Sequence, residues 1–159
     1  GRKVPMSRKC NQAGNDIIKS SEGFEPKAYY ATEEEKRKKL LSIGYGFTYY
    51  ADGSPIKKGD TMTREEADKL FDNHILAVYE DRVDKLVTSE LTDNQFSALV
   101  SLCYNIGSGN LKNSTLLALV NYGKFKQAAE EFLKWDKQNK RVLKGLTDRR
   151  IKERRLFLS

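Results

Sequence analysis

The spacing of the apolar residues changes twice along this chain, and this change limits its fold more than any other sequence feature. The segment "NDIIKSSEGF", from about Asn15, has the spacing of a short helix that ends at Gly23. From residue 27 to residue 56 the pattern is typical of β-strands, with Asp52 and Gly53 as a turn pair. Helical spacing then continues to the C-terminus. The sequence therefore predicts an α+β fold with a small β-hairpin lobe and a larger helical lobe.

Capping boxes mark the start of two helices in the predicted helical lobe. Thr63 is followed three residues later by Glu66, and Thr92 by Gln95, which is the spacing of reciprocal helix caps. The first helix is expected to be long and to join the two lobes, and the segment from Gly107 to Gly109 is expected to close the second. The inward stripe of the first helix is predicted to consist of Ala67, Leu70, Phe71, His74, Ile75 and Val78.

Two shorter helices and a C-terminal helix are predicted beyond residue 110. The segments "STLLALVNYG" and "KFKQAAEEFLKW" have helical spacing, and Gly123 ends the first of them. Gly145 is expected to break the chain before Thr147 caps "DRRIKERRLFL". The prediction is a single domain over residues 15–159, with the β-lobe at about 24–60 and the helical lobe at about 61–159. Residues 1–14 are expected to be an N-terminal leader or a remnant of expression.

The net charge indicates an anionic partner. The 159 residues include 29 Lys and Arg and 22 Asp and Glu, a formal net charge of +7, which favours nucleic acid, a membrane surface or an acidic wall polymer. The basic residues are spread over most predicted helices instead of one recognition element, so nucleic acid ranks last. The sequence has no apolar run long enough to cross a bilayer, and its start lacks the apolar segment of a signal peptide. We expect no membrane insertion, and a cytoplasmic location until release or export by another route.

The cysteines and the single histidine do not indicate a metal or a disulfide. Cys10 and Cys103 lie in different contexts, so two free thiols are expected, with Cys103 a small core residue. His74 has no cysteine or carboxylate at the spacing of a zinc site. It is expected to be a buried or half-buried side chain of its helix, and no metal or cofactor is predicted.

Glu22 is the residue whose position most suggests chemistry. It lies at the end of the first helix and directly before the β-lobe, where it would face a crevice between lobes, a suitable place for a long polymer. An acid held there can act as a general acid. Gly44 and Gly46 remove side chains from one face of the strand "SIGYGF" and would let a bulky ligand approach. The alternative is a surface glutamate next to a bulged strand.

Several segments in a fixed order resemble the phage-type lysozymes, also called endolysins or glycoside hydrolase family 24. The matching pieces of the small lobe are "IIKSSEGF", "KAYY" and "SIGYGFT". The helical lobe matches in "LTDNQFSALVSLCYNIGSGNLKNSTLLALVN", "AAEEFLKW" and "GLTDRRIKERRLFLS", so the resemblance runs from about Asp16 to Ser159. The resemblance implies a lysozyme fold and cleavage of the β-1,4 bond between N-acetylmuramic acid and N-acetylglucosamine, with Glu22 as the proton donor.

The chain departs from the family at the second catalytic group. Glycoside hydrolysis needs a base or nucleophile besides the acid, and in the family a loop Asp or Cys, helped by a Thr, fills that role. The family spacing from Glu22 leads to Ala31, which has no group for this chemistry, and the Thr position is Ser42, which keeps a hydroxyl. The family's His position is Phe47.

Three explanations of Ala31 stay open. The longer loop "TEEEKRKKLL" would bring Glu33, Glu34 or Glu35 to the vacant place, the alanine is an engineered inactivation, or the site binds glycan without cleaving it. The plainer interpretation of this charged run is a solvated, salt-bridged hairpin tip. We favour hydrolysis with an unusual second group over a silent peptidoglycan-binding module. In either case the expected partner is the glycan strand at the bacterial cell wall, and a monomer is expected.

The resemblance also implies a set of residues that contact the substrate. These are Tyr45, Phe47, Asn105, Ser114, Thr115, Arg149 and Arg150. Without the resemblance, Asn105, Ser114 and Thr115 are ordinary helix-end and cap residues. The alternative for the two arginines is a basic helix face, with Arg149 and Glu153 paired at i,i+4.

Overall fold

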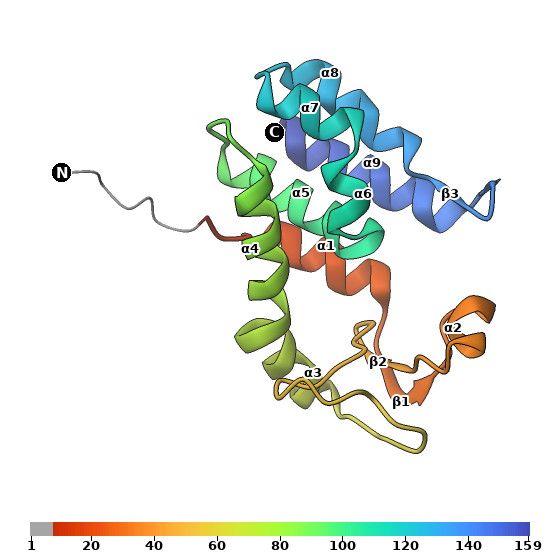
Figure 1. Cartoon of the computed structure of the whole chain (residues 1–159). Helices are drawn as coiled ribbons and strands as arrows, with labels where there is room; N and C mark the ends of the chain where they lie inside the picture. The colour runs from red at the N-terminus through yellow and green to blue at the C-terminus, as the bar shows by residue number, and fades with distance from the viewer. Residues whose placement is uncertain (1–7) are drawn as a thin grey trace. The chain divides into compact units, whose positions relative to one another are not determined.

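The computed structural model describes residues 8–159, which form two compact units. The small unit comprises Lys19–Ala77, and the helical unit comprises the residues up to Ile18 and Val78–Ser159. Helix α1 (Gln12–Glu22) has its last turn in the small unit, and α4 (Leu76–Leu86) begins there (Figure 1). The predicted α+β class is confirmed, with most of the chain in helices.

The small unit contains much less strand than the sequence predicted. Strand β1 (Glu25–Tyr29) pairs antiparallel with β2 (Ser42–Gly44), and a bulge separates the two ends of the pairing. The expected turn at Asp52 and Gly53 is present, because the amide of Gly53 donates to the carbonyl of Tyr50 over 2.9 Å. The residues on either side of this turn form only one isolated bridge, between Tyr49 and Pro55. The charged run between the strands is helix α2 (Glu33–Arg37) instead of a hairpin tip.

A π-helical turn overturns the predicted position of His74. The capping box of Thr63 and Glu66 starts α3 (Arg64–Leu70), as predicted, but η1 (Phe71–Ile75) follows, and the amide of Leu76 donates to the carbonyl of Phe71. The extra residue in this turn shifts the helix phase, so the buried stripe passes from Phe71 to Leu76 and skips His74, which is exposed. The expected inward histidine is therefore wrong.

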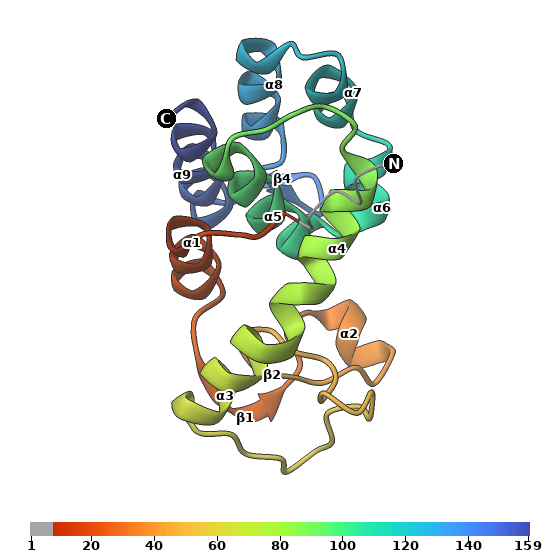
Figure 2. The ribbon, with the colours of Figure 1, turned by 90° about the vertical axis from the view of Figure 1, so that its left-hand side faces the viewer.

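The helical unit is built around α5 (Asp93–Ile106). The capping box of Thr92 and Gln95 starts this helix and Gly107, with φ +86°, ends it, as the sequence predicted. Its residues from Phe96 to Cys103 are all buried, which is the pattern of a central helix. Helix α9 (Lys144–Leu158) packs along it (Figures 1 and 2). The other elements are α6 (Ser108–Lys112), α7 (Thr115–Asn121), α8 (Phe125–Glu131) and the short 3-10 helix η2 (Phe132–Lys134).

The segment before the last helix differs from the prediction. A small hairpin of β3 (Lys137–Gln138) and β4 (Arg141–Val142) precedes α9, which already begins at Lys144 and includes Gly145. Thr147 is not a cap, because its hydroxyl lies inside the first turn and donates to the carbonyl of Leu143 over 3.2 Å. A four-residue hairpin has too few residues to produce a periodic signal in the sequence.

The expected leader does not extend to residue 14. Helix α1 begins at Gln12, and the amide of Cys10 donates to the Glu80 carboxylate over 2.6 Å. The Arg8 guanidinium donates to Asp84 and to the carbonyls of Val87 and Ser89. Residues 1–7 lie outside the described residues. Both cysteines are free and buried. The core position of Cys103 was predicted, whereas the burial of Cys10 was not. Burial raises the pKa of the Cys10 thiol to about 12.

Candidate functional site

Glu22 is the last residue of α1 and lies in the small unit. Gly23 follows with φ +71°, and its amide donates to the carbonyl of Lys19 over 3.0 Å, so the helix ends where the sequence predicted. A negative charge at a helix C-terminus is unfavourable, by roughly 0.3–1 kcal/mol at an exposed site. The stability of the helix therefore gives no reason for a half-buried acid at this position.

The Glu22 carboxylate lies directly over the backbone of Gly46. A Cβ at residue 46 would come within 2.8 Å of Glu22 Oε1, and Gly46 has φ +79°. Only a glycine satisfies both conditions without displacing the acid. The space at Gly44 has a different use, since a Cβ there would lie 2.7 Å from the Phe47 ring. The protein itself, and not a ligand, therefore occupies the space beside Gly44.

A hydrogen-bond network fixes the last turn of α1 to the small unit. The Lys19 ammonium donates to Asp68 Oδ1 over 3.0 Å, and the Tyr45 hydroxyl donates to the same oxygen over 2.7 Å. The Tyr45 hydrogen bond, followed by that of Lys19, lowers the pKa of the Asp68 carboxyl. Lys19 also lies over the ring of Phe71, 4.9 Å from its centroid. These contacts begin three residues before Glu22 and fix the backbone that carries it.

Tyr45 and Phe47 belong to the core of the small unit. Their exposed fractions are 3% and 2%, and the two rings pack edge to face with centroids 6.0 Å apart. Burial, and then the hydrogen bond to Asp68, raises the pKa of the Tyr45 phenol. Little of either side chain is therefore accessible to a sugar in the described structure.

Tyr29 and Ser42 adjoin each other at the end of the β1–β2 pair. Their Cα atoms are partners in the sheet register, and Ser42 is buried. Burial first, and then the charges of Glu22, Glu25 and Glu35, raise the pKa of the Tyr29 phenol. The phenol therefore remains protonated near neutral pH and can donate a hydrogen bond. The sequence motifs indicated Ser42 and Glu22 but not Tyr29, whose only signal was its place in the motif "KAYY".

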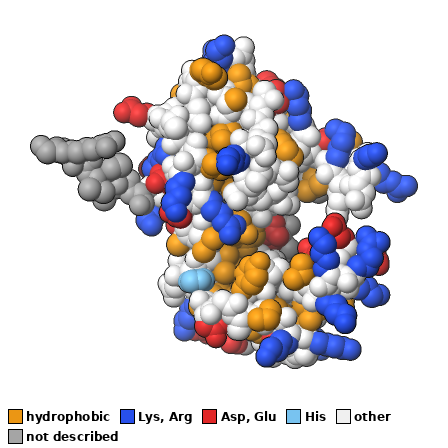
Figure 3. Space-filling view, in the orientation of Figure 1, with side chains coloured by type: hydrophobic (Ala, Val, Ile, Leu, Met, Phe, Trp, Pro, Cys, Tyr) orange, Lys and Arg blue, Asp and Glu red, His pale blue; other side chains and the backbone are white. Residues whose placement is uncertain are grey.

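The three candidate glutamates of α2 have different surroundings. Figure 3 shows acidic and basic side chains intermingled where α2 lies. Glu33 and Glu34 are exposed, and Glu34 pairs with Lys38 over 3.0 Å. Glu35 is half-buried, and its Oε2 atom is buried with no hydrogen-bond donor among residues 8–159. Ala31 is exposed and lies just before the cap of this helix.

The predicted sugar-binding residues of the helical unit serve mainly as helix ends. Asn105 is exposed in the last turn of α5. Ser114 caps α7, since its hydroxyl oxygen accepts from the amide of Leu117 over 3.0 Å. Thr115 is the exposed first residue of that helix. The side chains of Asn105 and Thr115 are therefore accessible, whereas the Ser114 hydroxyl is already used by the fold.

Arg149 and Arg150 are buried, with exposed fractions of 4% and 0%, so they are not a solvated basic face. Arg149 donates to the carbonyl of Ser101 over 3.0 Å, and both guanidinium groups pair with Glu153. The predicted i,i+4 pair of Arg149 and Glu153 is present, but inside the unit. Burial raises the pKa of the Glu153 carboxyl against the opposing effect of the two arginines. These described contacts join α9 to α5.

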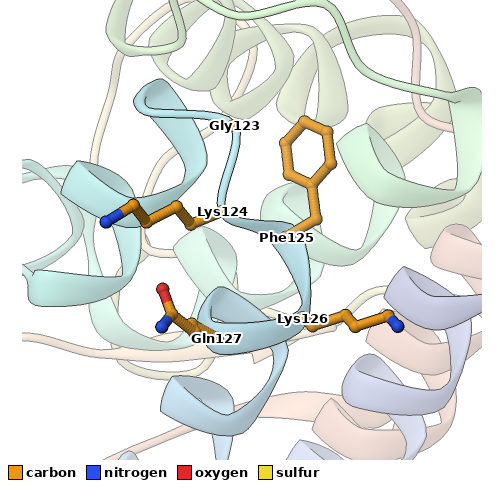
Figure 4. A pocket seen from close by; sticks show the side chains of 5 residues that line it. All are labelled: Gly123, Lys124, Phe125, Lys126 and Gln127. Carbon is orange, nitrogen blue, oxygen red and sulfur yellow. The ribbon is translucent and has the colours of Figure 1, made fainter.

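The remaining surfaces of the described chain do not suggest a second reactive site. Residues 8–159 contain no cluster of three His, Cys, Asp or Glu side chains that could hold a metal ion. Within the same range, no helix is long and apolar enough to span a membrane. A shallow depression of about 370 Å³ is lined by Gly123–Gln127 at the start of α8. Figure 4 shows that the side chains of Lys124, Phe125 and Lys126 point in different directions there, so they do not converge on a ligand.

Comparison with known proteins places these features in a family. The model of the phage lysozyme family matches residues 19–153. The chain belongs to the phage lysozyme family. The endolysin of Bacillus phage B103 is 46% identical over 94% of this chain, and this match covers 54% of that protein. The endolysin of Salmonella phage P22 is 37% identical over 89% of this chain and 92% of its own length. The chain thus spans about half the length of the Bacillus phage endolysins that it matches, and nearly all of the P22 endolysin.

The fold agrees with solved structures. The muramidase domain of SpmX from Asticaccaulis excentricus superimposes with a TM-score of 0.81 at 35% identity, over 96% of this chain and 99% of that domain. The fold is therefore lysozyme-like, mostly helical with small hairpins, as the resemblance implied.

Proposed function

We propose that this chain is a muramidase that hydrolyses the β-1,4 bond between N-acetylmuramic acid and N-acetylglucosamine in peptidoglycan. The observation that carries the proposal is the carboxylate of Glu22, which is held against the Gly46 backbone at the end of α1 in a chain of the phage lysozyme family. Relatives named endolysin, and a neighbouring structure named a muramidase domain, support the substrate class. The site of action is the bacterial cell wall.

In this proposal Glu22 is the general acid. Its proton passes to the glycosidic oxygen as the bond to the anomeric carbon breaks, and the sugar develops oxocarbenium character. Ser42 supports the reaction by binding a water or a sugar hydroxyl beside Tyr29, its partner in the sheet register. Asn105 and Thr115 are the accessible candidates for sugar contacts on the helical unit.

Ala31 favours one alternative, a module that binds peptidoglycan without cleaving it. Its methyl group cannot act as base, nucleophile or charge stabiliser. In that case the chain would bind sacculi and release no soluble fragments. Turnover separates the two functions.

Clearing of purified sacculi, followed by assay of new reducing ends, tests the proposal. We expect this chain to clear sacculi and Glu22→Gln to lose that activity, because glutamine cannot donate the proton. Glu65→Gln is the matched control, since Glu65 is an exposed acid on α3 paired with Lys69. Binding of the unchanged chain without any release would contradict the muramidase function. Recovery of clearing in Ala31→Asp would then identify an inactivated enzyme, and no recovery a binding module.

A further inference from the structure

The helix that follows Ala31 supplies a carboxylate that the family motif does not contain. We propose that Glu35 is the second carboxylate of the reaction, the base that takes a proton from the attacking water. The inference rests on the muramidase function proposed above. It assigns one of three neighbouring glutamates, which sequence alone does not distinguish.

The surroundings of the side chains separate Glu35 from its neighbours. Glu33 and Glu34 are exposed, and the ion pair of Glu34 with Lys38 is a surface contact. Glu35 Oε2 is buried and receives no hydrogen bond from residues 8–159. Buried carboxylate oxygens are normally satisfied by a donor, so this oxygen is an unused acceptor. The side chain as a whole is only half-buried, so part of it remains accessible to the attacking water.

Both ends of α2 fix the backbone of Glu35. At the start of the helix, the hydroxyl oxygen of Thr32 accepts from the amide of Glu35 over 3.0 Å. At its end, the amide of Leu40 donates to the carbonyl of Glu35 over 2.8 Å, while Lys39 has φ +57°. The amide of Lys39 donates to the carbonyl of Lys36. Together with the bond from Leu40 to Glu35, it forms a Schellman motif. The caps thus hold both polar backbone groups of Glu35, and neither backbone group of Glu33 takes part in them.

The loop that carries Glu35 leaves the small sheet after Tyr29 and returns to it at Ser42. Burial first, and then the charges of Glu22, Glu25 and Glu35, raise the pKa of the Tyr29 phenol. Ser42, the partner of Tyr29 in the sheet register, adds a buried hydroxyl. Tyr29 stays protonated near neutral pH and can donate a hydrogen bond to the water or the sugar.

The proposed step conserves atoms and charge. The water oxygen bonds to the anomeric carbon of N-acetylmuramic acid as its bond to the glycosidic oxygen breaks. The proton of the water goes to Glu35, and the proton of Glu22 goes to the leaving oxygen of N-acetylglucosamine. Direct attack by water from the opposite face inverts the anomeric configuration.

Single substitutions within α2 test the assignment. We expect Glu35→Gln to lower kcat on sacculi by about 100-fold or more, since a positioned acid or base contributes 10²–10⁴-fold. Glu33→Gln and Glu34→Gln, which change neighbouring acids of the same helix, should keep activity near that of the unchanged chain. The three variants should have the same thermal unfolding midpoint. A loss of activity in Glu35→Gln would then not be due to a loss of fold.

Two further measurements separate a base from a structural residue. Azide needs no deprotonation, so it should restore bond cleavage in Glu35→Ala and give an inverted glycosyl azide, whereas it should not rescue Glu22→Gln. NMR of the initial products of the unchanged chain should show inversion. The inference is overturned by full activity in Glu35→Gln, by an equal loss in Glu33→Gln, by absence of azide rescue, or by retention of configuration. An unchanged chain that never clears sacculi would instead refute the muramidase function itself.

Discussion

Gly46 combines two constraints on a single residue. Its backbone has φ +79°, and its missing Cβ leaves the space that Glu22 Oε1 occupies. The first constraint concerns the stability of the small unit, and the second concerns the position of the proposed acid. A comparison with another glycine of positive φ can separate them.

We expect Gly46→Ala to lose both stability and activity. An alanine at positive φ costs about 1–2 kcal/mol, and its methyl group displaces the flexible end of Glu22. Gly53→Ala is the matched control, because Gly53 has φ +85° and its Cβ would meet no atom within 4 Å. Urea unfolding should show similar losses in both variants, while sacculus clearing falls only in Gly46→Ala. Equal clearing by the two variants would show that the contact with Glu22 does not position it.

Asp68 provides a pH-dependent contribution to stability. Its hydrogen bonds to Tyr45 and Lys19 lower the pKa of its carboxyl in the folded state. A group with a depressed pKa stabilises the fold above its unfolded pKa, near 3.9, and loses this contribution as pH falls through the folded value. Asp68→Asn should therefore reduce the free energy of unfolding at pH 7, by about 1 kcal/mol or less because Asp68 is partly exposed.

Urea unfolding at several pH values checks the expected sign. The difference between Asp68→Asn and the unchanged chain should shrink as the pH falls below about 3.9, because Asp68 then becomes protonated in both states. Glu65→Asn serves as the exposed control with little effect at any pH. A difference that grew toward acid pH would contradict the assigned direction.

At the scale of elements, local caps fix where helices begin and end, and the caps of α2 also fix Glu35. The unusual residue in the C-terminal cap of α2 is Lys39, which has φ +57° at the position where helices commonly have glycine. The charged run of α2 places acids in its first turn and bases in its last, which favours a helix over the expected hairpin tip.

Lys39→Gly should stabilise the small unit. Glycine adopts a positive φ at no steric cost, so we expect a gain of up to roughly 1 kcal/mol in the free energy of unfolding. Lys38→Gly removes the same charge at a residue with φ −82°, and it should destabilise instead. Thermal unfolding of the two variants measures the contrast. A loss of stability in Lys39→Gly would mean that the lysine side chain outweighs the strain of its backbone.

At the scale of the whole molecule, the net positive charge comes from outside the small unit. Residues 19–77 contain 10 Lys and Arg and 11 Asp and Glu, so the small unit is nearly neutral. Residues 108–159 alone contain 13 basic and five acidic residues. The unit that carries the proposed acid is therefore not the unit that would attract an anionic wall.

Binding to sacculi should weaken with salt through the helical unit. The Debye length is about 10 Å at 0.1 M ionic strength, so exposed charges are increasingly screened above that concentration. With Glu22→Gln as an inactive background, neutralising Lys124, Lys126 and Lys140 should lower both the affinity and its salt dependence. Neutralising Lys27, Lys57 and Lys58 of the small unit removes the same charge and should change binding less. Co-sedimentation with sacculi across a salt series measures the affinity and its salt dependence for both sets of variants. Binding that does not depend on salt would show that the charge is incidental.

The sequence alone determined the features that depend on neighbouring residues. The capping boxes at Thr63 and Thr92, the end of α1 at Gly23 and the motif around Glu22 each lie within a few residues, so their signals survive in the linear order. The same holds for the order of segments that identified the family.

Only the tertiary structure decided burial and partners, because these depend on residues far apart in the chain. Tyr45 points inward to Asp68, 23 residues away, and Arg149 bonds to Ser101, 48 residues away. One extra residue in a π-turn moved His74 out of the buried stripe. The choice among the glutamates of α2 has the same origin: identical side chains differ only in what the folded chain places around them, and that surrounding distinguishes Glu35.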